Sequence, residues 1–250
     1  MHTKLVALVT GANKGIGLQI AKDLTTRGLT VLIGSRDLSR GEAAAREVGA
    51  DARAIQLDVT DGASIAAAAS RIERELGRLD VLINNAGVAS LGDDVGSFEE
   101  RIERRLPSRV SIDEVRGVFE TNVFGVIAVT QAMLPLLREA PDGRIVNVSS
   151  EVGSLAKQTD PSNPYRHIIS ASYSPSKTAL NAVTVAFANE LAGTRIKVNA
   201  MCPGFTATDL NQHRGTRSVA QGAREAVRLA LLGEDGPTAS FSNEAGPLPW

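Results

Sequence analysis

Short apolar runs alternate along the chain with longer segments in which apolar residues recur at helical spacing. The apolar runs predict strands at residues 5–9, 30–34, 54–57, 81–83, 144–148 and 195–201. The helical spacing predicts helices that end near residue 27 or span residues 40–48, 63–76, 118–137, 173–191 and 218–231. Strands that are apolar on both faces and joined by helices indicate an α/β fold: a doubly wound, mainly parallel sheet with helices on both faces.

This alternation runs from residue 1 to residue 250 without an internal repeat, a low-complexity tract or a linker. We therefore expect a single domain of the Rossmann type. In open sheets of this kind, ligands bind at the carboxyl ends of the strands, near the point where the strand order reverses. The residues that follow each predicted strand are therefore the first candidates for a functional site.

Charge and composition argue against several kinds of partner. The 27 Lys and Arg residues nearly balance the 28 Asp and Glu residues, and no basic run favours nucleic acid or an anionic membrane. The three histidines are scattered, so we expect no metal site. The single cysteine, Cys202, excludes an internal disulfide and is expected to be a small buried residue in a strand. With no leader-like N-terminus and no apolar run near the ~18 residues of a membrane span, we expect a cytoplasmic protein.

A glycine-rich turn follows the first predicted strand and leads into a helix, with the sequence T-G-A-N-K-G-I-G at residues 10–17. Its glycines permit a tight turn, a close approach of the backbone to a phosphate and close packing of helix on strand. The N–H groups at the start of the helix would face an anion. The spacing differs from the commoner fingerprint G-x-G-x-x-G, so the stretch is either a dinucleotide-binding turn or a glycine-rich turn without a ligand.

The end of the second predicted strand selects between NAD(H) and NADP(H). An acidic residue at this place binds the ribose 2′-hydroxyl, whereas an arginine accommodates a 2′-phosphate. Ser35 stands where the acid would be, Arg36 follows it, and Lys14 and Arg40 add positive charge. Asp37 opposes this interpretation, because a strand that ended two residues later would make it the NAD-type acid. We expect NADP(H).

Two further strand ends carry polar residues. Asp58 could accept a hydrogen bond from an adenine amino group, or it could be a solvated loop acid. The stretch N-N-A-G at residues 84–87 suits a backbone that passes close to a cofactor, with side-chain amides that join neighbouring strands.

Tyr173 and Lys177 are four residues apart, which places them on one face of a predicted helix. A phenol has an ordinary pKa of about 10, so it exchanges protons poorly near neutral pH unless a nearby positive charge stabilises the phenolate. Lys177 could supply that charge. The alternative is a surface tyrosine above a surface lysine. Pro175 fits the first turn of the helix, where its missing N–H costs little.

Together, T-G-x-x-x-G-x-G, the turn at Asp58, N-N-A-G and Y-x-x-x-K resemble the short-chain dehydrogenase/reductase family over essentially the whole chain. Asn13-Lys14, residues 35–41 and the C-terminal end look closest to the NADPH-dependent carbonyl reductases. The resemblance implies one dinucleotide-binding and catalytic domain that reduces a ketone or aldehyde, in which the nicotinamide gives the hydride and Tyr173 gives the proton. It also implies that Lys177 lowers the phenol pKa and holds the nicotinamide ribose.

The resemblance assigns the remaining site residues. Its S-x-x-G pattern selects Ser150 rather than Ser149 to hydrogen-bond the substrate carbonyl, although either hydroxyl could do so. Asn122 would support a water-linked proton path to the lysine, or be an amide packed against a neighbouring backbone. Thr208, at the end of a P-G-x-x-x-T segment that turns over the nicotinamide, would bond the carboxamide. The implied cofactor contacts are Gly11, Asn13, Lys14, Gly15, Ile16, Gly17, Arg36, Arg40, Asp58, Val59, Asn85, Ala86, Gly87, Tyr173, Lys177, Pro203, Gly204, Thr206 and Thr208.

Three segments depart from the family pattern. Residues 92–111 form a charged insertion, expected to be a solvated loop or short helix, or a lid over the substrate. Residues 157–170 read as a loop just before Tyr173, in which Tyr165 and His167 either line the substrate pocket or only anchor the loop. Residues 239–250 lack the usual ending of a strand plus V-D-G-G. The second and third departures favour a monomer over the dimer or tetramer common in the family.

Two other functions are compatible with the same residues. The scaffold could reduce C=C or C=N bonds rather than C=O. A non-catalytic NADP(H)-binding regulator could share the fold but would need no complete proton relay, and Asn122, Ser150, Tyr173 and Lys177 are all present.

Overall fold

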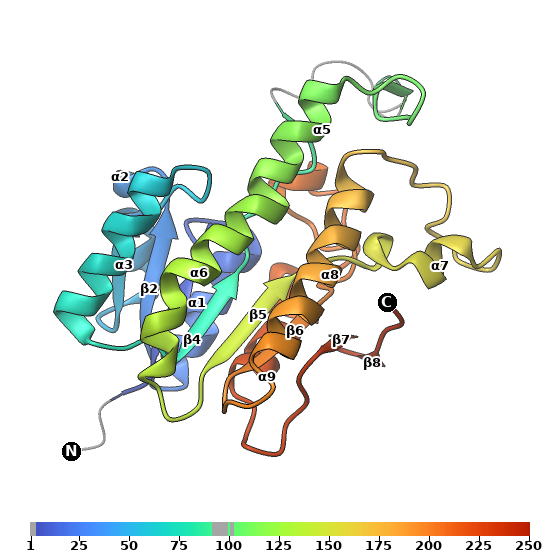
Figure 1. The fold of residues 1–250 in the computed structure, drawn as a ribbon. Helices are drawn as coiled ribbons and strands as arrows, with labels where there is room; N and C mark the ends of the chain where they lie inside the picture. Colours follow the sequence, from blue (N-terminus) through green and yellow to red (C-terminus); the bar gives the residue numbers. More distant parts are fainter. Residues whose placement is uncertain (1–3, 92–99, 101–102) are drawn as a thin grey trace.

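The computed structural model describes residues 4–91, 100 and 103–250. One sheet of eight strands, in the order β3-β2-β1-β4-β5-β6-β7-β8, lies between two layers of helices (Figure 1). The strands are β1 Val6–Val9, β2 Thr30–Ser35, β3 Ala52–Gln56, β4 Val81–Asn84, β5 Arg144–Val148, β6 Lys197–Met201, β7 Ser240–Asn243 and β8 Gly246–Pro247. All neighbouring strands pair in parallel except β7 and β8, which are antiparallel. The predicted doubly wound α/β fold is therefore confirmed.

The helices divide between the two faces of the sheet. The principal ones are α1 Gly15–Thr26, α2 Leu38–Val48, α3 Gly62–Leu76, α5 Ile112–Phe119, α6 Gly125–Arg138, α7 Leu155–Thr159, α8 Tyr173–Glu190 and α9 Val219–Ala230. Val6 and Leu8 of β1 pack with side chains of α3, α6 and α8, whereas Ala7 and Val9 pack with α1, α2 and α9. Because side chains alternate along a strand, a strand covered on both faces must be apolar at every position, as β1 is.

The C-terminal end corrects one expectation. Residues 239–250 were expected to lack a family-type strand, but β7 continues the parallel sheet beside β6, with Phe241 opposite Ala200. The ring of Trp250 stacks on Phe241 at a centroid distance of 5.6 Å. The Trp250 carbonyl accepts hydrogen bonds from the Ala156 N–H and the Ser154 hydroxyl, both at 3.2 Å. The chain end is thereby fixed against the start of α7.

The two insertions differ in how far the structure describes them. Residues 92–99, 101 and 102 of the first, half of the predicted loop or lid, lie outside the described residues. The second insertion was predicted to be a loop, but α7 reaches Thr159, inside it, before a series of turns. The Ala171 N–H donates to the Arg105 carbonyl at 3.2 Å, so the residue that follows the second insertion contacts the first insertion.

The helical run from Ile112 to Arg138 is longer than the predicted helix, which was expected to begin at residue 118. Ser111 caps its start by accepting the Glu114 N–H at 3.1 Å. Among the described residues, this run is long and apolar enough to cross a bilayer by length and composition, contrary to the expectation that no segment approaches a membrane span. Val129, Met133 and Leu137 on it are fully buried in the core, and packing against the sheet accounts for its apolar character.

A series of hydrogen bonds between buried amides and hydroxyls connects strands β4 and β5 with helices α6 and α8. Asn84 at the end of β4 donates to the Thr130 hydroxyl of α6 at 3.1 Å and to the side-chain amide oxygen of Asn147 at 2.9 Å. Asn147 of β5 donates in turn to Thr184 of α8 at 2.9 Å. The expected use of amides to join strands is therefore confirmed at Asn84. The same series of hydrogen bonds also fixes α6 and α8 on the sheet.

Asn147→Ala should lower the free energy of unfolding by about 2–3 kcal/mol, because it leaves a cavity and removes the partners of buried polar groups. Urea unfolding followed by circular dichroism measures the change. Lys22→Ala, which removes an exposed ion pair to Glu47, is the control and should cost less than about 1 kcal/mol. A loss of the same small size for Asn147→Ala would show that this series of hydrogen bonds does not stabilise the fold.

Candidate active site

Tyr173 opens helix α8, and serine side chains fix that start. The Ser170 hydroxyl accepts the N–H of Ser172 at 3.2 Å and that of Tyr173 at 3.0 Å. Pro175 lies in the first turn, as expected, where a missing N–H costs no intrahelical bond. The position of the Tyr173 side chain is therefore set by the end of the second insertion as well as by α8.

Lys177 lies one turn further along α8, with its ammonium group 5.7 Å from the centre of the Tyr173 ring. Only 4% of the residue is exposed, and Nζ donates to the Val148 carbonyl at the end of β5 at 2.8 Å. A buried ammonium needs such a partner. The pair is therefore not a surface tyrosine above a surface lysine.

The pKa of Tyr173 moves opposite to the expected direction. Burial raises it to about 12, reinforced by the nearby Cys202 thiol and opposed by a hydrogen bond with the Ser150 side chain. Burial also lowers the pKa of Lys177 to about 8. The net shift is therefore opposite to the predicted lowering, because loss of solvent makes the largest contribution. A phenol with this pKa is protonated at neutral pH, the state that a proton donor requires.

The two adjacent serines have different partners. Ser149 is buried, and its hydroxyl donates to the Asn181 side chain at 2.6 Å. Ser150 is half-buried and hydrogen-bonds the side chain of Tyr173. The geometry thus gives a physical reason for Ser150, which the sequence selected only by its resemblance to a family pattern.

Asn122 lies in a π-helical turn, Glu120–Phe124, between α5 and α6. Its amide oxygen accepts the Val88 N–H at 2.9 Å, and its nitrogen donates to the Val88 carbonyl at 2.8 Å and to Ser176 at 3.0 Å. These contacts match the alternative of an amide packed against a neighbouring backbone. A proton path through Asn122 stays a prediction. The π turn is notable because such turns often occur at functional sites.

The glycine-rich turn and the N-N-A-G segment pack directly against each other. Gly11 has φ +61°, and a Cβ there would lie 2.9 Å from the Ala86 Cα. Asn85 donates to the carbonyls of Thr10 and Gly11 at 2.9 and 3.1 Å. A Cβ on Gly17 would come within 2.4 Å of the Asn85 amide nitrogen. Glycine is therefore required at both positions, because neighbouring atoms fill the space that a Cβ would take.

The segment after β6 approaches the same turn. A Cβ on Gly15 would lie 3.7 Å from the Thr208 methyl group, so Thr208 lies beside the glycine-rich turn. Lys14 instead pairs with Asp209 at 2.6 Å. The Thr206 hydroxyl donates to the Pro203 carbonyl at 3.0 Å and is buried, so this side chain serves its own loop. A Cβ on Gly87 would lie 3.6 Å from Lys177 Nζ, which joins this region to the Tyr173 pair.

At the end of β2, Asp37 is the N-cap of α2. Its carboxylate accepts the Arg40 N–H at 3.1 Å and the Ser39 hydroxyl at 2.7 Å, and these bonds lower its pKa. Arg40 pairs with the same carboxylate at 3.4 Å. Arg36 is exposed immediately after the strand, and its charge contributes to the lowered pKa of Asp58, after the hydrogen bonds from Thr60. Arg36 and Asp58 therefore share one edge of the sheet, while Asp37 is committed to the cap.

For the other predicted cofactor residues, the structure gives burial and packing but no polar contact that tests the prediction. Asn13 is half-buried in the glycine-rich turn. Ile16 and Val59 pack against the two cores. Tyr165 and His167 of the second insertion are exposed, which favours neither of the roles considered for them.

Cys202 has a structural role that the sequence did not predict. It follows β6 rather than lying in it, and its sulfur accepts the backbone N–H groups of Glu151 and Gly204 at 3.2 and 3.3 Å. Burial raises its thiol pKa to about 11. Only its place directly after a predicted strand hinted at this.

Comparison with known proteins agrees with this geometry. The sequence profile of the short chain dehydrogenase family matches residues 5–218. The chain is 36% identical to (-)-isopiperitenone reductase of Mentha piperita over 94% of this chain and 95% of that protein. It is 33% identical to carbonyl reductase [NADPH] 1 of Pongo abelii, over 98% of both chains. The structure of NADPH-bound carbonyl reductase from chicken fatty liver superposes with a TM-score of 0.82 at 25% identity, covering 99% of this chain and 100% of that one.

Lys177 should titrate near pH 8 in the folded protein, because burial disfavours its charged form. NMR of labelled lysine side chains, with Lys177→Met to assign the signal, measures the midpoint. The unfolded chain binds this proton up to about pH 10.4, so between these values the unfolded state holds more protons. Relative to Lys177→Met, the free energy of unfolding should therefore rise with pH over this interval, by at most about 1.4 kcal/mol per unit. A midpoint above pH 10 would contradict the burial.

Proposed function

The chain belongs to the short-chain dehydrogenase/reductase family, and from that premise we propose that it reduces a ketone or aldehyde to an alcohol with NADPH. The observation that carries the proposal is the convergence of Ser150, Tyr173 and Lys177 at the carboxyl ends of the strands. The matched proteins named as carbonyl reductases that use or bind NADPH support the same chemistry.

The residues at the strand ends fit NADPH. Glycines 11 and 17 have no space for a Cβ, so the turn presents bare backbone, and the N-terminus of α1 offers N–H groups to the pyrophosphate. Arg36, exposed just past β2, would bind the 2′-phosphate as a guanidinium fork. Asp58 on the same edge would accept the adenine amino group. Gly87 and Thr208 border the place expected for the nicotinamide.

Bound NADPH supplies the hydride that the carbonyl carbon accepts. Ser150 and Tyr173 are hydrogen-bonded to each other, so their two hydroxyls can both face one carbonyl oxygen. Tyr173 is protonated at neutral pH and donates its proton to that oxygen. Lys177 holds a positive charge beside the ring, which stabilises the phenolate that remains. Val148 keeps the ammonium in place through its carbonyl.

Reduction of C=C or C=N bonds would use the same cofactor residues. A panel of ketones, aldehydes, imines and enones, followed by NADPH absorbance and repeated with NADH, separates these reactions. Oxidation of NADPH by carbonyl substrates is the expected result. Turnover of imines or enones alone would overturn the proposal.

The proposal extends to a cytoplasmic monomer. The single cysteine is consistent with a reducing compartment, and the near-neutral surface gives no basic run for an anionic membrane. The insertion before Tyr173 supports the monomer, because in carbonyl reductases an insertion here covers the helix that other members use to pair. The C-terminal end no longer supports it, because β7 is present.

Tyr173→Phe should reduce kcat for carbonyl reduction by at least about a hundredfold and leave NADPH binding nearly unchanged, because only the proton donor is removed. Steady-state kinetics and NADPH fluorescence titration measure the two effects. The chain has two tyrosines, and Tyr165→Phe is the matched control that should keep full activity. Substantial turnover by Tyr173→Phe would remove this residue from the mechanism.

Arg36→Ala should raise the KM for NADPH roughly tenfold to a hundredfold and change the KM for NADH little, because a charged hydrogen bond to the 2′-phosphate is lost. Kinetics with both cofactors measure the ratio. Arg46→Ala, at an exposed position in the last turn of α2, is the control for a general loss of positive charge. Equal effects on both cofactors would show that Arg36 does not select between them.

A further inference from the structure

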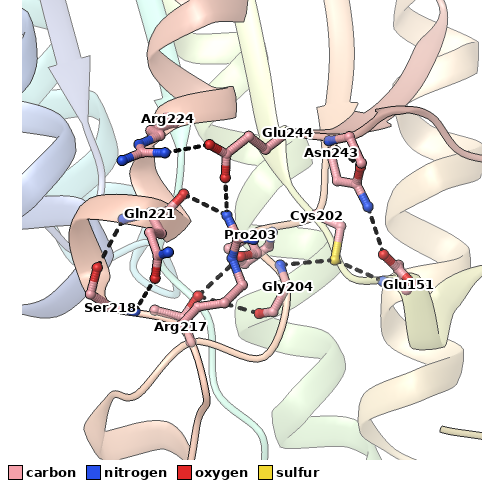
Figure 2. Close-up of polar contacts among 12 residues, drawn as sticks. Glu151, Cys202, Pro203, Gly204, Arg217, Ser218, Gln221, Arg224, Asn243 and Glu244 are labelled. Atoms are coloured by element: carbon pink, nitrogen blue, oxygen red, sulfur yellow. Dashed lines mark hydrogen bonds and ion pairs between the residues drawn. The ribbon is translucent and has the colours of Figure 1, made fainter. Parts of the chain in front are cut away.

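The turn between β7 and β8 reaches both loops of the proposed active site. Its adjacent residues Asn243 and Glu244 point to different partners, as Figure 2 shows. One partner, Glu151, directly follows Ser150 in the loop after β5. The other, Arg217, lies against Gly204 in the loop after β6. Neither Asn243 nor Glu244 is a residue that the proposed chemistry uses.

Asn243 acts on the loop that carries Ser150. Its side-chain nitrogen donates to Glu151 Oε1 at 2.8 Å, while Lys157 holds the other carboxylate oxygen at 3.0 Å. The side-chain oxygen of Asn243 accepts the Ala245 N–H at 2.8 Å and so fixes the turn itself. The residue beside Ser150 is therefore held from two sides.

Glu244 acts on the loop after β6 through Arg217. Its carboxylate binds the guanidinium groups of Arg217 and Arg224, the latter at 2.5 Å. The Arg217 backbone pairs with this loop, because its N–H donates to the Phe205 carbonyl at 3.0 Å and its carbonyl accepts the Ala207 N–H at 2.9 Å.

The Arg217 side chain covers Gly204. Gly204 has φ +70°, and a Cβ there would lie 2.6 Å from the Arg217 Cδ. The stem of Arg217 thus presses on the turn from which Thr206 and Thr208 follow. Only Arg217, and not Arg224, joins Glu244 to this turn.

Cys202 joins the two loops beneath this network. Its sulfur accepts the N–H of Glu151 from one loop and that of Gly204 from the other. A displacement of either loop therefore changes the geometry of the second, and both approach Tyr173, whose pKa responds to the Cys202 thiol.

We infer that Asn243 and Glu244 are positioning residues: Asn243 sets the loop of Ser150, and Glu244, through Arg217, sets the loop expected to cover the nicotinamide. This inference rests on the proposed function, because it assigns these loops to the carbonyl and to the cofactor. The ion pair of Arg217 with Glu244 has side chains 30% and 35% exposed, and exposed pairs add little to stability. The contribution of the turn is therefore to geometry, where a shift of about 1 Å can cost about a hundredfold in rate.

The first test exchanges the hydrogen bond between Asn243 and Glu151. Asn243→Asp keeps the acceptor for Ala245 but sets a carboxylate against Glu151, and should lower kcat for carbonyl reduction about tenfold without changing the NADPH dissociation constant. Combining Asn243→Asp with Glu151→Gln restores a donor and an acceptor in reversed order and should return kcat to within about twofold of wild type. A merely structural role would lower melting temperature and affect both parameters together.

The second test separates the two ion pairs of Glu244. Glu244→Gln should raise the NADPH dissociation constant about tenfold, measured by fluorescence titration, because it releases Arg217 from Gly204. Arg224→Gln breaks the other ion pair only and should bind NADPH as wild type does. Glu75→Gln breaks a comparably exposed pair with Arg71, 39% and 42% exposed, and should also have no effect.

These outcomes are separable from failure of the proposed function. A wild type that binds NADPH but reduces no carbonyl contradicts the proposed reaction, while the fluorescence titrations still test Glu244. Normal NADPH affinity in Glu244→Gln, or an equal loss in Arg224→Gln, overturns the role of Glu244. A loss of kcat in Asn243→Asp that the added Glu151→Gln does not reverse, or no loss at all, overturns the role of Asn243.

Discussion

The buried ammonium group of Lys177 constrains the whole site. A charge that is 4% exposed must find a partner, and the carbonyl of Val148 at the end of β5 provides it. Helix α8 also lies so close to the turn after β5 that a Cβ on Gly153 would approach the backbone of Lys177 to 2.7 Å. The buried hydrogen bond from Asn147 of β5 to Thr184 holds the same helix two turns further along. Tyr173 and its high pKa are consequences of this close packing.

Local patterns predicted the parts of the molecule that depend on local forces. Strands such as β1 are apolar because both of their faces are covered, so their sequence pattern predicts them. The glycines of residues 10–17 are needed where the chain packs closely or has a positive φ, so their positions predict the turn. Strand β7 was not predicted, because Ser240–Asn243 consists of polar residues and one phenylalanine. Pairing with β6, rather than its own sequence pattern, makes it a strand.

The properties that were missed depend on distant residues. The pKa of Tyr173 follows from burial that includes Cys202, and no spacing along the chain gives that distance. The structure gives a physical reason for the choice of Ser150 over Ser149, because the Ser149 hydroxyl already donates a hydrogen bond to Asn181. In sequence, Asp37 could be an NAD-type acid. The end of β2 at Ser35 and the hydrogen bonds from Ser39 and Arg40 instead make it a helix cap. Arg217 and Glu244 form their contact across 27 positions.

The place of β7 at the far side of the parallel sheet has a consequence for biosynthesis. Synthesis runs from the N-terminus, so strands β1 to β6 have all been made once residue 201 is in place. Residues 240–250 are made later, and they bring the contacts of Asn243 and Glu244 to the loops after β5 and β6. Six of the seven parallel strands are therefore made before the residues that hold the two site loops, so the site can reach its final geometry only after residues 240–250 have joined the fold.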